Sequence, residues 1–363
     1  MSSPSILGHT GWSILFTAAL VGTTTVIVEP AGQRSRDIDR LSADRPSTLY
    51  AQTQLTRTRQ SPARPEPRWG HVMVYDSARD RVVLFGGAAS PTVTLGDTWE
   101  WDGRRWQRID VTGPSARAYS AAAYDSRRGR IVLHGGRSSD RLPLGDTWEW
   151  DGITWHRVAR DVPAARDHHA MAYDATRGVA VLFGGYDGSA VRADTWEWDG
   201  REWRSTTAAG PPSRAAFAMT YDPAIQRTVV YGGLWLGGLY ADVWAWNGTA
   251  WTALTRPYAN ATLDHHAGAY DARRERAVFF GGKDYRSTAR RELVDWYDDT
   301  LLTLPTDEPA PAPRYNTGLV YDSRRAQLMV FGGRIREGEG FLAYGDLWTW
   351  DGRSWEEITL EGR

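Results

Sequence analysis

Apolar and polar positions recur along residues 68–363 with a period of about 49 residues. Once in each period, a short unbroken run of β-branched and aromatic residues ends in two glycines, as in Arg81–Phe85 followed by Gly86 and Gly87. The equivalent runs are 130–134, 179–183 followed by Gly184 and Gly185, 227–231, 276–280 and 327–331. Such runs, without polar alternation, predict six strands that are each covered on both faces.

A second segment of each period alternates strictly between apolar and polar residues. In 97–101, the side chains of Trp99 and Trp101 fall on one face of a predicted strand. Asp102-Gly103 then predicts a tight hairpin turn before a strand that begins near Trp106. The equivalent triplets are Trp148, Trp150 and Trp155; Trp196, Trp198 and Trp203; Trp244, Trp246 and Trp251; and Trp348, Trp350 and Trp355. With one more strand ending at a Tyr-Asp dipeptide, each repeat contains four antiparallel strands, named a to d.

The predicted sheets have two apolar faces to cover. An open stack of six such sheets would leave an apolar face exposed at each end, whereas closing the stack into a ring covers every face. We therefore predict an all-β, six-bladed β-propeller of four-stranded antiparallel blades over residues 68–363. Because the repeats begin with strand a and end with strand d, we expect each blade to consist of four consecutive strands.

The repeats share an Arg before strand a, the Tyr-Asp dipeptide, the Gly-Gly pair, an acidic residue before strand c and a closing Trp. This set resembles the Kelch repeat in the form common in bacterial proteins. The resemblance covers roughly residues 68–360 and implies the propeller fold. It implies little about function, because this fold carries binding proteins, adaptors and a few enzymes.

The residues before the repeats have a different composition. Residues 1–32 contain no Lys or Arg and include an uncharged, largely apolar stretch, Trp12–Val28. This stretch predicts an export signal or anchor, or alternatively an unstructured tail, since secretory signals normally begin with positive charge. Residues 33–67 are rich in Arg, Ser, Thr and Pro and predict a disordered linker. We expect export to the periplasm, the surface or the medium rather than a cytoplasmic location.

Composition excludes several classes of function. The chain has no Cys, which excludes disulfides, thiolate metal sites and cysteine nucleophiles. A net charge of -1 argues against binding of nucleic acid through overall charge. Dinucleotide fingerprints, phosphate-binding loops and nucleophile elbows do not occur in the sequence. We therefore expect no cofactor, no metal and no nucleic-acid partner, and the oligomeric state stays open.

Most repeat markers are expected to be structural. The Trp side chains should be buried between blades, and the glycine pairs should adopt positive φ angles. The acidic residues before strand c should accept hydrogen bonds from loop backbone; they are Asp97, Asp146, Asp194, Asp242, Glu292 and Asp346. The arginines before strand a should tie neighbouring blades through carbonyls or these carboxylates, or alternatively form an anion-binding ring; they are Arg68, Arg117, Arg166, Arg214 and Arg314.

Two repeats depart from the pattern. In the fifth, Leu263 replaces the leading Arg, and Val294 and Leu301 replace two of the three Trp, leaving Trp296. In the sixth, the segment between strands b and c is longer and runs from Arg334 to Tyr344. Such irregular loops on a rigid scaffold are where function concentrates.

The b–c loops are the variable loops of the repeats, and in an up-and-down meander they share one face. We expect the residues just after the Gly pairs to ring the channel mouth there: Ala88, Arg137, Tyr186, Leu234, Lys283 and Arg334, followed by Asp187, Trp235, Asp284 and Tyr285. Arg, aromatic and acidic residues around a concave mouth suit a sugar or an acidic peptide, because flat faces of the ligand stack on rings and its oxygens accept hydrogen bonds from Arg. The candidate ligand-binding residues are therefore Arg137, Tyr186, Asp187, Trp235, Lys283, Tyr285 and Arg334, with solvated loop tips as the alternative.

Three histidines occupy one repeat position at the start of strand a. His71, His169 and His266 lie in alternate repeats, and three imidazoles around an axis are able to bind a metal. In the other repeats this position holds Ser120, Phe217 and Thr317. We therefore expect the histidines to pack or to form hydrogen bonds rather than to bind metal.

These observations predict a non-catalytic binding or interaction module that presents its variable loop face to a protein or a carbohydrate. The resemblance implies one alternative, a sugar mutarotase, whose acid/base pair would come from Asp187, Asp284 or Glu337 with Arg137 or His266. Kelch-like propellers also include the copper oxidase of galactose. The absence of Cys in this chain excludes the cysteine-linked tyrosyl centre of that enzyme. A third possibility is an intracellular adaptor in which residues 1–67 recruit a partner.

Overall fold

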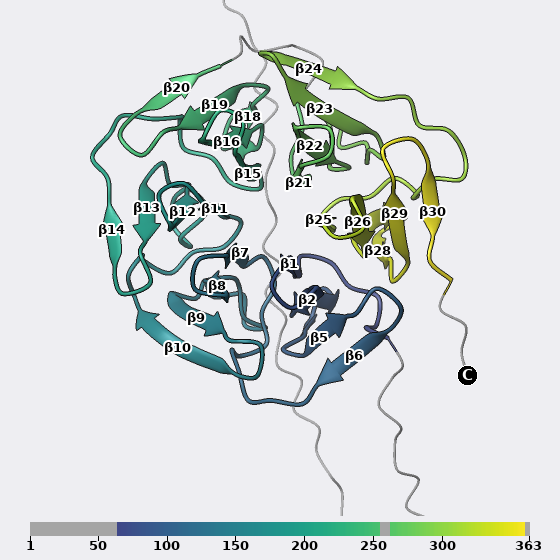
Figure 1. Ribbon diagram of the computed structural model, residues 1–363, viewed down its shortest axis with the longest axis horizontal. Coiled ribbons are helices and arrows are strands. Elements are labelled where there is room, and N and C mark those ends of the chain that lie inside the picture. The colour runs from purple at the N-terminus through teal and green to yellow at the C-terminus, as the bar shows by residue number, and fades with distance from the viewer. Residues whose placement is uncertain (1–63, 255–261, 360–363) are drawn as a thin grey trace, which may run out of the picture. The chain divides into compact units, whose positions relative to one another are not determined.

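The computed structural model describes residues 64–254 and 262–359. Every regular element in these ranges is a β-strand, and the strands form six four-stranded antiparallel sheets around a central axis (Figure 1). The predicted all-β, six-bladed propeller is therefore confirmed. No helix in the described ranges is long and apolar enough to span a membrane. The predicted leader, residues 1–32, and most of the predicted linker, residues 33–67, lie outside the described residues.

In each blade, strand a lies nearest the axis and strand d at the rim (Figure 1). Blade one consists of β1 (Val72–Asp76), β2 (Arg81–Phe85), β5 (Thr98–Trp101) and β6 (Trp106–Ile109). Blade two consists of β7 (Ala121–Asp125), β8 (Arg130–His134), β9 (Asp146–Trp150) and β10 (Trp155–Arg160). Blade three consists of β11 (Ala170–Asp174), β12 (Val179–Phe183), β13 (Thr195–Trp198) and β14 (Trp203–Ser205).

The remaining blades follow the same order. Blade four consists of β15 (Ala218–Asp222), β16 (Arg227–Tyr231), β19 (Val243–Trp246) and β20 (Trp251–Ala253). Blade five consists of β21 (Ala267–Asp271), β22 (Arg276–Phe280), β23 (Leu293–Tyr297) and β24 (Thr300–Thr303). Blade six consists of β25 (Gly318–Asp322), β26 (Gln327–Phe331), β29 (Leu347–Trp350) and β30 (Trp355–Glu357).

Three b–c loops form small hairpins of their own. They are β3 (Ala88–Ser90) with β4 (Val93–Thr94), β17 (Leu234–Trp235) with β18 (Gly238–Leu239), and β27 (Arg334–Glu337) with β28 (Gly340–Ala343). The longer segment predicted in blade six is the third hairpin. These hairpins give the b–c face relief that the short a–b and c–d turns of the opposite face do not have.

The ring closes between whole blades. Strand β1 contacts β25 of the last blade as well as β7 of the second, so the innermost strands form a continuous circle. Each sheet contains four strands that are consecutive apart from the loop hairpins, and no strand is exchanged between the first and last blades. The expectation of whole blades is therefore confirmed.

Six clusters of the apolar core are each shared by two adjacent blades, and a seventh, smaller cluster consists of Trp69, Ala88 and Ala118. Successive residues of strand b point to opposite clusters: Val82 and Leu84 pack with residues of blade six, whereas Val83 and Phe85 pack with residues of blade two. This arrangement explains why strand b is apolar without alternation, since both of its faces are buried. The clusters of blades one and six, and of five and six, complete the circle.

The predicted burial of the repeated Trp residues is confirmed for all three in blades one and six, whereas in blades two to four the first Trp of each triplet is half-buried. In blade one, Trp99, Trp101 and Trp106 are buried, and Trp101 pairs directly with Trp106 across the c–d hairpin. Trp198 of blade three packs against blade two, and its indole N–H donates to Glu149 Oε1 of that blade at 2.9 Å. The tryptophans therefore seal the faces between neighbouring blades.

The predicted arginine contacts are confirmed, but the route by which they join two blades is different. The Arg117 guanidinium donates to the Gly135 carbonyl (3.0 Å) and to Asp146 Oδ1 (2.6 Å), and both acceptors belong to the arginine's own blade. The link to the preceding blade is made by the backbone, because Gly87 N–H donates to the Arg117 carbonyl at 2.8 Å. The acidic residue accepts from this guanidinium and from the Trp148 indole, not from loop backbone as expected.

The other regular blades repeat this arrangement with Arg68, Arg166, Arg214 and Arg314. Their side chains are at most 2% exposed, and each holds a carboxylate in its own blade. The alternative of an anion-binding ring is therefore wrong, because no guanidinium of this set faces solvent.

Blade five keeps the strand register despite its altered sequence. Val294 pairs with Phe279 as Trp99 pairs with Leu84 in blade one, and Trp296 pairs with Leu301 at the end of the c–d hairpin. The replaced tryptophans are therefore side-chain changes at unchanged backbone positions, as the sequence predicted.

Replacing Trp198 with Ala tests the role of these interfaces. We expect Trp198→Ala to lower the free energy of unfolding by about 3–5 kcal/mol, because it opens a cavity between blades two and three. The matched control is Trp235→Ala, since Trp235 is 45% exposed on a loop hairpin and should leave Tm unchanged. Calorimetry on the two variants measures the difference, and equal Tm values would refute the assignment of Trp198 to the core.

Candidate functional site at the channel mouth

A closed ring of backbone hydrogen bonds surrounds the axis at the b–c face. One residue from each blade takes part, two positions before strand a, and each has a φ angle between 53° and 62°. The N–H of each donates to the carbonyl of its counterpart in the preceding blade at 2.7–3.1 Å. The six residues are Gly70, Tyr119, His168, Ala216, His265 and Asn316. The left-handed conformation, uncommon for residues other than Gly, turns each N–H toward the neighbouring blade.

The side chains of this ring and of the residues after it line a central cavity of about 130 Å³. Tyr119 stacks on His168 with ring centroids 4.1 Å apart, and His168 meets His265 edge to face at 5.3 Å. His265 in turn lies edge-on to Tyr315. The mouth of the channel is therefore lined by aromatic and imidazole rings rather than by aliphatic side chains.

The three histidines at the start of strand a pack between blades, as expected. The ring of His266 contacts Tyr231 of blade four edge to face, and the ring of His71 contacts Phe331 of blade six in the same manner. Phe217 occupies the same place in blade four, against Phe183. Burial lowers the pKa of His71 to about 3 and the pKa of His266 to about 4, so both rings are neutral near pH 7.

The predicted mouth residues lie at one level of the b–c face. Each pairs through its backbone with the residue just before the hydrogen-bonded ring, as Arg137 does with Ala118 and Arg334 with Tyr315. Ala88, Tyr186, Leu234 and Lys283 make the equivalent pairs. The prediction that these positions ring the channel mouth is therefore confirmed for their backbone, although their side chains have different partners.

Arg137 is engaged with a buried carboxylate. Its guanidinium binds Asp167 through two hydrogen bonds, of 2.7 and 2.9 Å, and the same carboxylate contacts His168 Nδ1 at 2.5 Å. Burial alone would raise the pKa of Asp167, but the bonds from His168 and Arg137 lower it below its usual value. Arg137 therefore has a structural role that was not predicted from the sequence. Its positive charge is balanced by the Asp167 carboxylate.

Lys283 is also close to a carboxylate. Its Nζ lies 3.7 Å from Asp264 Oδ1 and 5.1 Å from the centre of the Tyr315 ring. Asp264 stands at the same repeat position as Asp167, which binds Arg137. Three of the residues that ring the channel mouth are cations: Arg137, Lys283 and Arg334. Arg137 and Lys283 thus each have a carboxylate nearby.

Arg334 is different, because it forms no ion pair with any residue that the structure describes. Its guanidinium lies over the rings of Phe341 (4.3 Å to the centroid), Trp69 (4.9 Å) and Tyr315 (5.1 Å). These three rings form a cage around the guanidinium. The Trp69 indole N–H donates to Tyr119 Oη at 2.9 Å, and this hydrogen bond fixes the position of Trp69 in the cage. An uncompensated cation held between aromatic rings is suited to bind an anion that also has a flat face.

A groove of about 280 Å³ lies between Arg334 and Arg137 and is called the mouth groove below. Its aromatic lining is Trp69, Tyr119 and Phe341, its cations are Arg137, Arg141 and Arg334, and its hydroxyl groups belong to Ser90, Thr92, Thr94, Ser138 and Ser139. Two predicted residues, Arg137 and Arg334, are therefore brought together by the fold, more than 190 positions apart in the sequence.

The other candidate residues lie outside the mouth groove. Tyr186 Oη donates to the Gly188 carbonyl, and Asp187 binds Arg192 and the backbone N–H groups of its own loop. Hydrogen bonds of this kind lower the pKa of Asp187 against the effect of burial. Trp235 and Tyr285 are exposed, at 45% and 62%, and Trp235 stacks on Tyr240. These four residues therefore belong to separate loops rather than to one site.

Sequence reasoning missed Trp69, Tyr119 and Phe341, which form the aromatic surface of the mouth groove. Trp69 occupies a repeat position that holds Ala118, Asp167, Ala215, Asp264 and Tyr315 in the other blades. Variability at one fixed position of an otherwise regular repeat was the available signal. Phe341 is at the end of a loop hairpin, and nothing in its local sequence indicates that it folds back onto Arg334.

Comparison with protein-family models and with curated protein sequences gave no match to this chain. The fold and the site define the structural class of this protein. It is a six-bladed β-propeller with a cationic, aromatic-lined groove at its b–c face. Within the described ranges, no group of His, Asp and Glu side chains has the arrangement of a metal site.

The buried histidines make stability depend on pH. An unfolded His binds a proton near pH 6.5, whereas His266 in the fold binds one only near pH 4, so stability falls as the pH drops from 6.5 to 4. We expect His266 to account for a loss of about 2 kcal/mol between pH 7 and pH 5. His266→Phe, which introduces the residue that blade four has at this position, Phe217, should remove this part of the loss.

Urea unfolding at pH 7 and pH 5 measures the effect. The control variant is His156→Gln, because the His156 side chain is 54% exposed on strand β10 rather than buried between blades. If His266→Phe loses as much stability on acidification as the unmodified protein, the buried neutral histidine is not the cause.

Proposed function

We propose that this propeller is a non-catalytic binding module of the Kelch type that binds an acidic carbohydrate in the mouth groove. The observation that carries the proposal is Arg334, a cation without an ion-pair partner among the described residues, held over Trp69, Tyr315 and Phe341. A carboxylate or sulfate on the ligand would supply the missing counter-charge. The neighbouring rings would stack on the flat face of a sugar.

The remaining lining of the mouth groove supports a sugar rather than an apolar ligand. The lining also includes the hydroxyl groups of Ser90, Thr92 and Ser138 and the cationic side chain of Arg141. Sugar hydroxyls both donate and accept hydrogen bonds, which matches such a lining. At about 280 Å³, the groove has room for one or two sugar rings rather than for a folded protein segment.

The mutarotase alternative has less support. Asp187 is bound to Arg192 and Asp284 to Arg290, and neither contacts Arg137 or His266 within the described residues. The ring of His266 is buried against Tyr231 and Phe279, and His266 lines the central cavity rather than the mouth groove. A general acid/base has to reach the ligand directly or through one water. We therefore base the proposal on binding.

Export of the chain is part of the proposal, because acidic polysaccharides are encountered at cell surfaces and outside cells. The segment that would direct export, Trp12–Val28, lies outside the described residues. Mass analysis of the N-terminus of protein recovered from the producing cells tests this point. A chain that retains Met1 and stays in the cytoplasm would contradict it.

Replacing Arg334 tests the binding proposal. We expect the protein to bind uronate-containing oligosaccharides on a glycan array and to bind their carboxyl-reduced counterparts much more weakly. Arg334→Gln should weaken the affinity for the acidic oligosaccharide by roughly tenfold or more, because a hydrogen bond to a charged group contributes about 1.5–3 kcal/mol. Calorimetric titration of the strongest array ligand measures this change.

The matched control is Arg336→Gln on the same hairpin, since Arg336 is exposed and does not line the mouth groove. The control variant should bind like the unmodified protein, and both variants should keep its Tm. Equal affinity of the Arg334 and Arg336 variants would remove the mouth groove as the binding site. Conversion of one anomer to the other during the titration, observed by NMR, would support the mutarotase instead.

A further inference from the structure

Blade five lacks the arginine that every other blade holds between a carbonyl and a carboxylate. In blade four, for example, Arg214 donates to the Gly232 carbonyl at 3.0 Å and to Asp242 Oδ1 at 2.7 Å. The Trp244 indole N–H donates to Asp242 as well, at 2.7 Å. A regular blade thus places a guanidinium and an indole N–H on each of these carboxylates.

The backbone of blade five keeps the same positions. Gly233 N–H donates to the Leu263 carbonyl at 2.8 Å, just as Gly185 N–H donates to the Arg214 carbonyl at 2.9 Å. Gly281 N–H donates to the carbonyl of Glu292 at 3.4 Å, as the equivalent glycines do to Asp residues elsewhere. Only the side chains differ: Leu263 has no guanidinium, and Val294 has no indole N–H.

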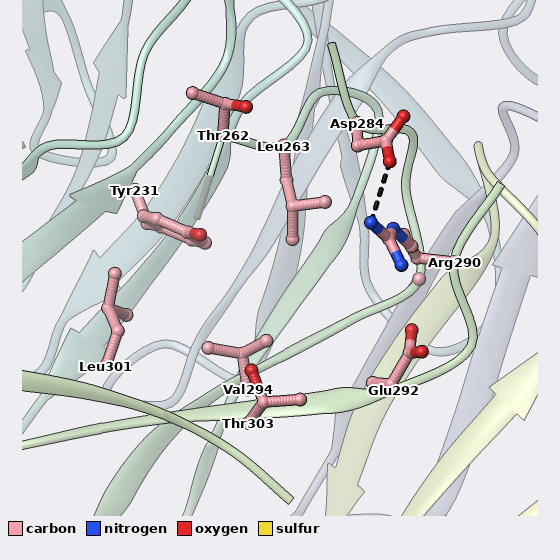
Figure 2. Close-up of a pocket in the computed structure, with 10 residues that line it drawn as sticks. Tyr231, Thr262, Leu263, Asp284, Arg290, Glu292, Val294, Leu301 and Thr303 are labelled. Atoms are coloured by element: carbon pink, nitrogen blue, oxygen red, sulfur yellow. Dashed lines mark hydrogen bonds and ion pairs between the residues drawn. The ribbon is translucent and has the colours of Figure 1, made fainter. Parts of the chain in front are cut away.

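These replacements leave a cavity of about 160 Å³, called the blade-five cavity (Figure 2). Leu263, Val294 and Leu301 form an apolar end, and Glu292 lies with the ion-paired Asp284 and Arg290 at the polar end. A cavity of about 150 Å³ engineered into another protein binds benzene, so this one has room for a single aromatic ring.

The polar end of the cavity holds three charged side chains, those of Asp284, Arg290 and Glu292. Asp284 and Arg290 neutralise each other at 2.7 Å, whereas Glu292 has no ion-pair partner among the residues that the structure describes. Among the described residues, its Oε2 accepts the backbone N–H of Arg291, at 3.0 Å. Gly281, whose carbonyl corresponds to the guanidinium acceptor of the other blades, also lines the cavity. The acceptors of the arginine site are therefore retained without the arginine.

We propose that the blade-five cavity binds a small organic cation, a guanidinium or amidinium group carried on a flat apolar body. The planar cation would take the place of the missing arginine head, donating to Glu292 and to the Gly281 carbonyl. The apolar body would fill the space that the tryptophans of the other blades occupy. This site shares no residue with the mouth groove and does not depend on the proposed carbohydrate binding.

Benzamidine is the probe, and benzamide, which has nearly the same shape without the charge, is the matched ligand control. We expect the full-length protein to bind benzamidine at least about tenfold more tightly than benzamide in calorimetric titrations. Glu292→Gln should reduce the affinity for benzamidine by about tenfold or more. The matched control variant is Glu339→Gln, an exposed carboxylate on the blade-six hairpin, which should bind benzamidine unchanged.

Refilling the cavity gives a second, independent test. Leu263→Arg restores the arginine of the regular blades, and it should abolish benzamidine binding and raise Tm, but raise it less when combined with Glu292→Gln. Should Leu263→Arg fail to fold, Val294→Trp fills the apolar end and should also abolish binding. Arg334→Gln in the mouth groove should leave benzamidine binding intact.

Several results would overturn the proposal. Equal binding of benzamidine and benzamide would mean that the cavity has no preference for a cation. Unchanged benzamidine binding by Glu292→Gln, or by a folded variant with the cavity refilled, would mean that the probe binds elsewhere. Absence of any binding by the unmodified protein at millimolar benzamidine would contradict the site itself.

Discussion

Each blade of this protein is a sheet with two apolar faces, and neither face can be covered within the blade. Six of the core clusters are each shared between two neighbouring blades, and one of them joins blade six to blade one. Closure therefore follows from burial rather than from an exchanged strand or a disulfide, since the chain has no Cys and its blades consist of their own strands. The ring of backbone hydrogen bonds at the axis depends on this closure, because its last link is between Gly70 and Asn316.

The requirement that each blade bury both of its faces against its neighbours also determines where the two proposed sites lie. Residues before strand a turn into the left-handed conformation to reach the next blade, and the side chains beside them, such as Trp69 and Tyr315, are thereby presented at the channel mouth. In the five regular blades, the buried arginine before strand a donates to the carbonyl of the first Gly of the pair and to the carboxylate before strand c. These contacts hold the b–c loop against its own sheet. Blade five has Leu263 in place of this arginine, and Leu263 lines the blade-five cavity. Regular repeats thus provide the scaffold, and the two proposed binding sites lie where the chain departs from the repeat.

Much of the fold could be predicted from the sequence, because the signals repeat six times with a regular spacing. The buried b strands, the Trp interfaces, the packing of His71 and His266 and the arginine–aspartate pairing all follow from residue type and position. The candidate site was predicted only in part. Arg137 and Arg334 were correctly placed at the mouth, but the Asp167 partner of Arg137 comes from the next blade, and the cage around Arg334 joins blades one and six. Contacts between loops so distant in sequence leave no local pattern.

Hydrogen–deuterium exchange at the six amides of the axial ring tests the central claim most directly. These are the backbone N–H groups of Gly70, Tyr119, His168, Ala216, His265 and Asn316. A ring closed by burial between all neighbours predicts that the six exchange together, only through global unfolding, with Gly70 and Asn316 as protected as the others. Fast exchange confined to Gly70, whose N–H makes the closing bond, would instead indicate an open array of blades and would contradict the account.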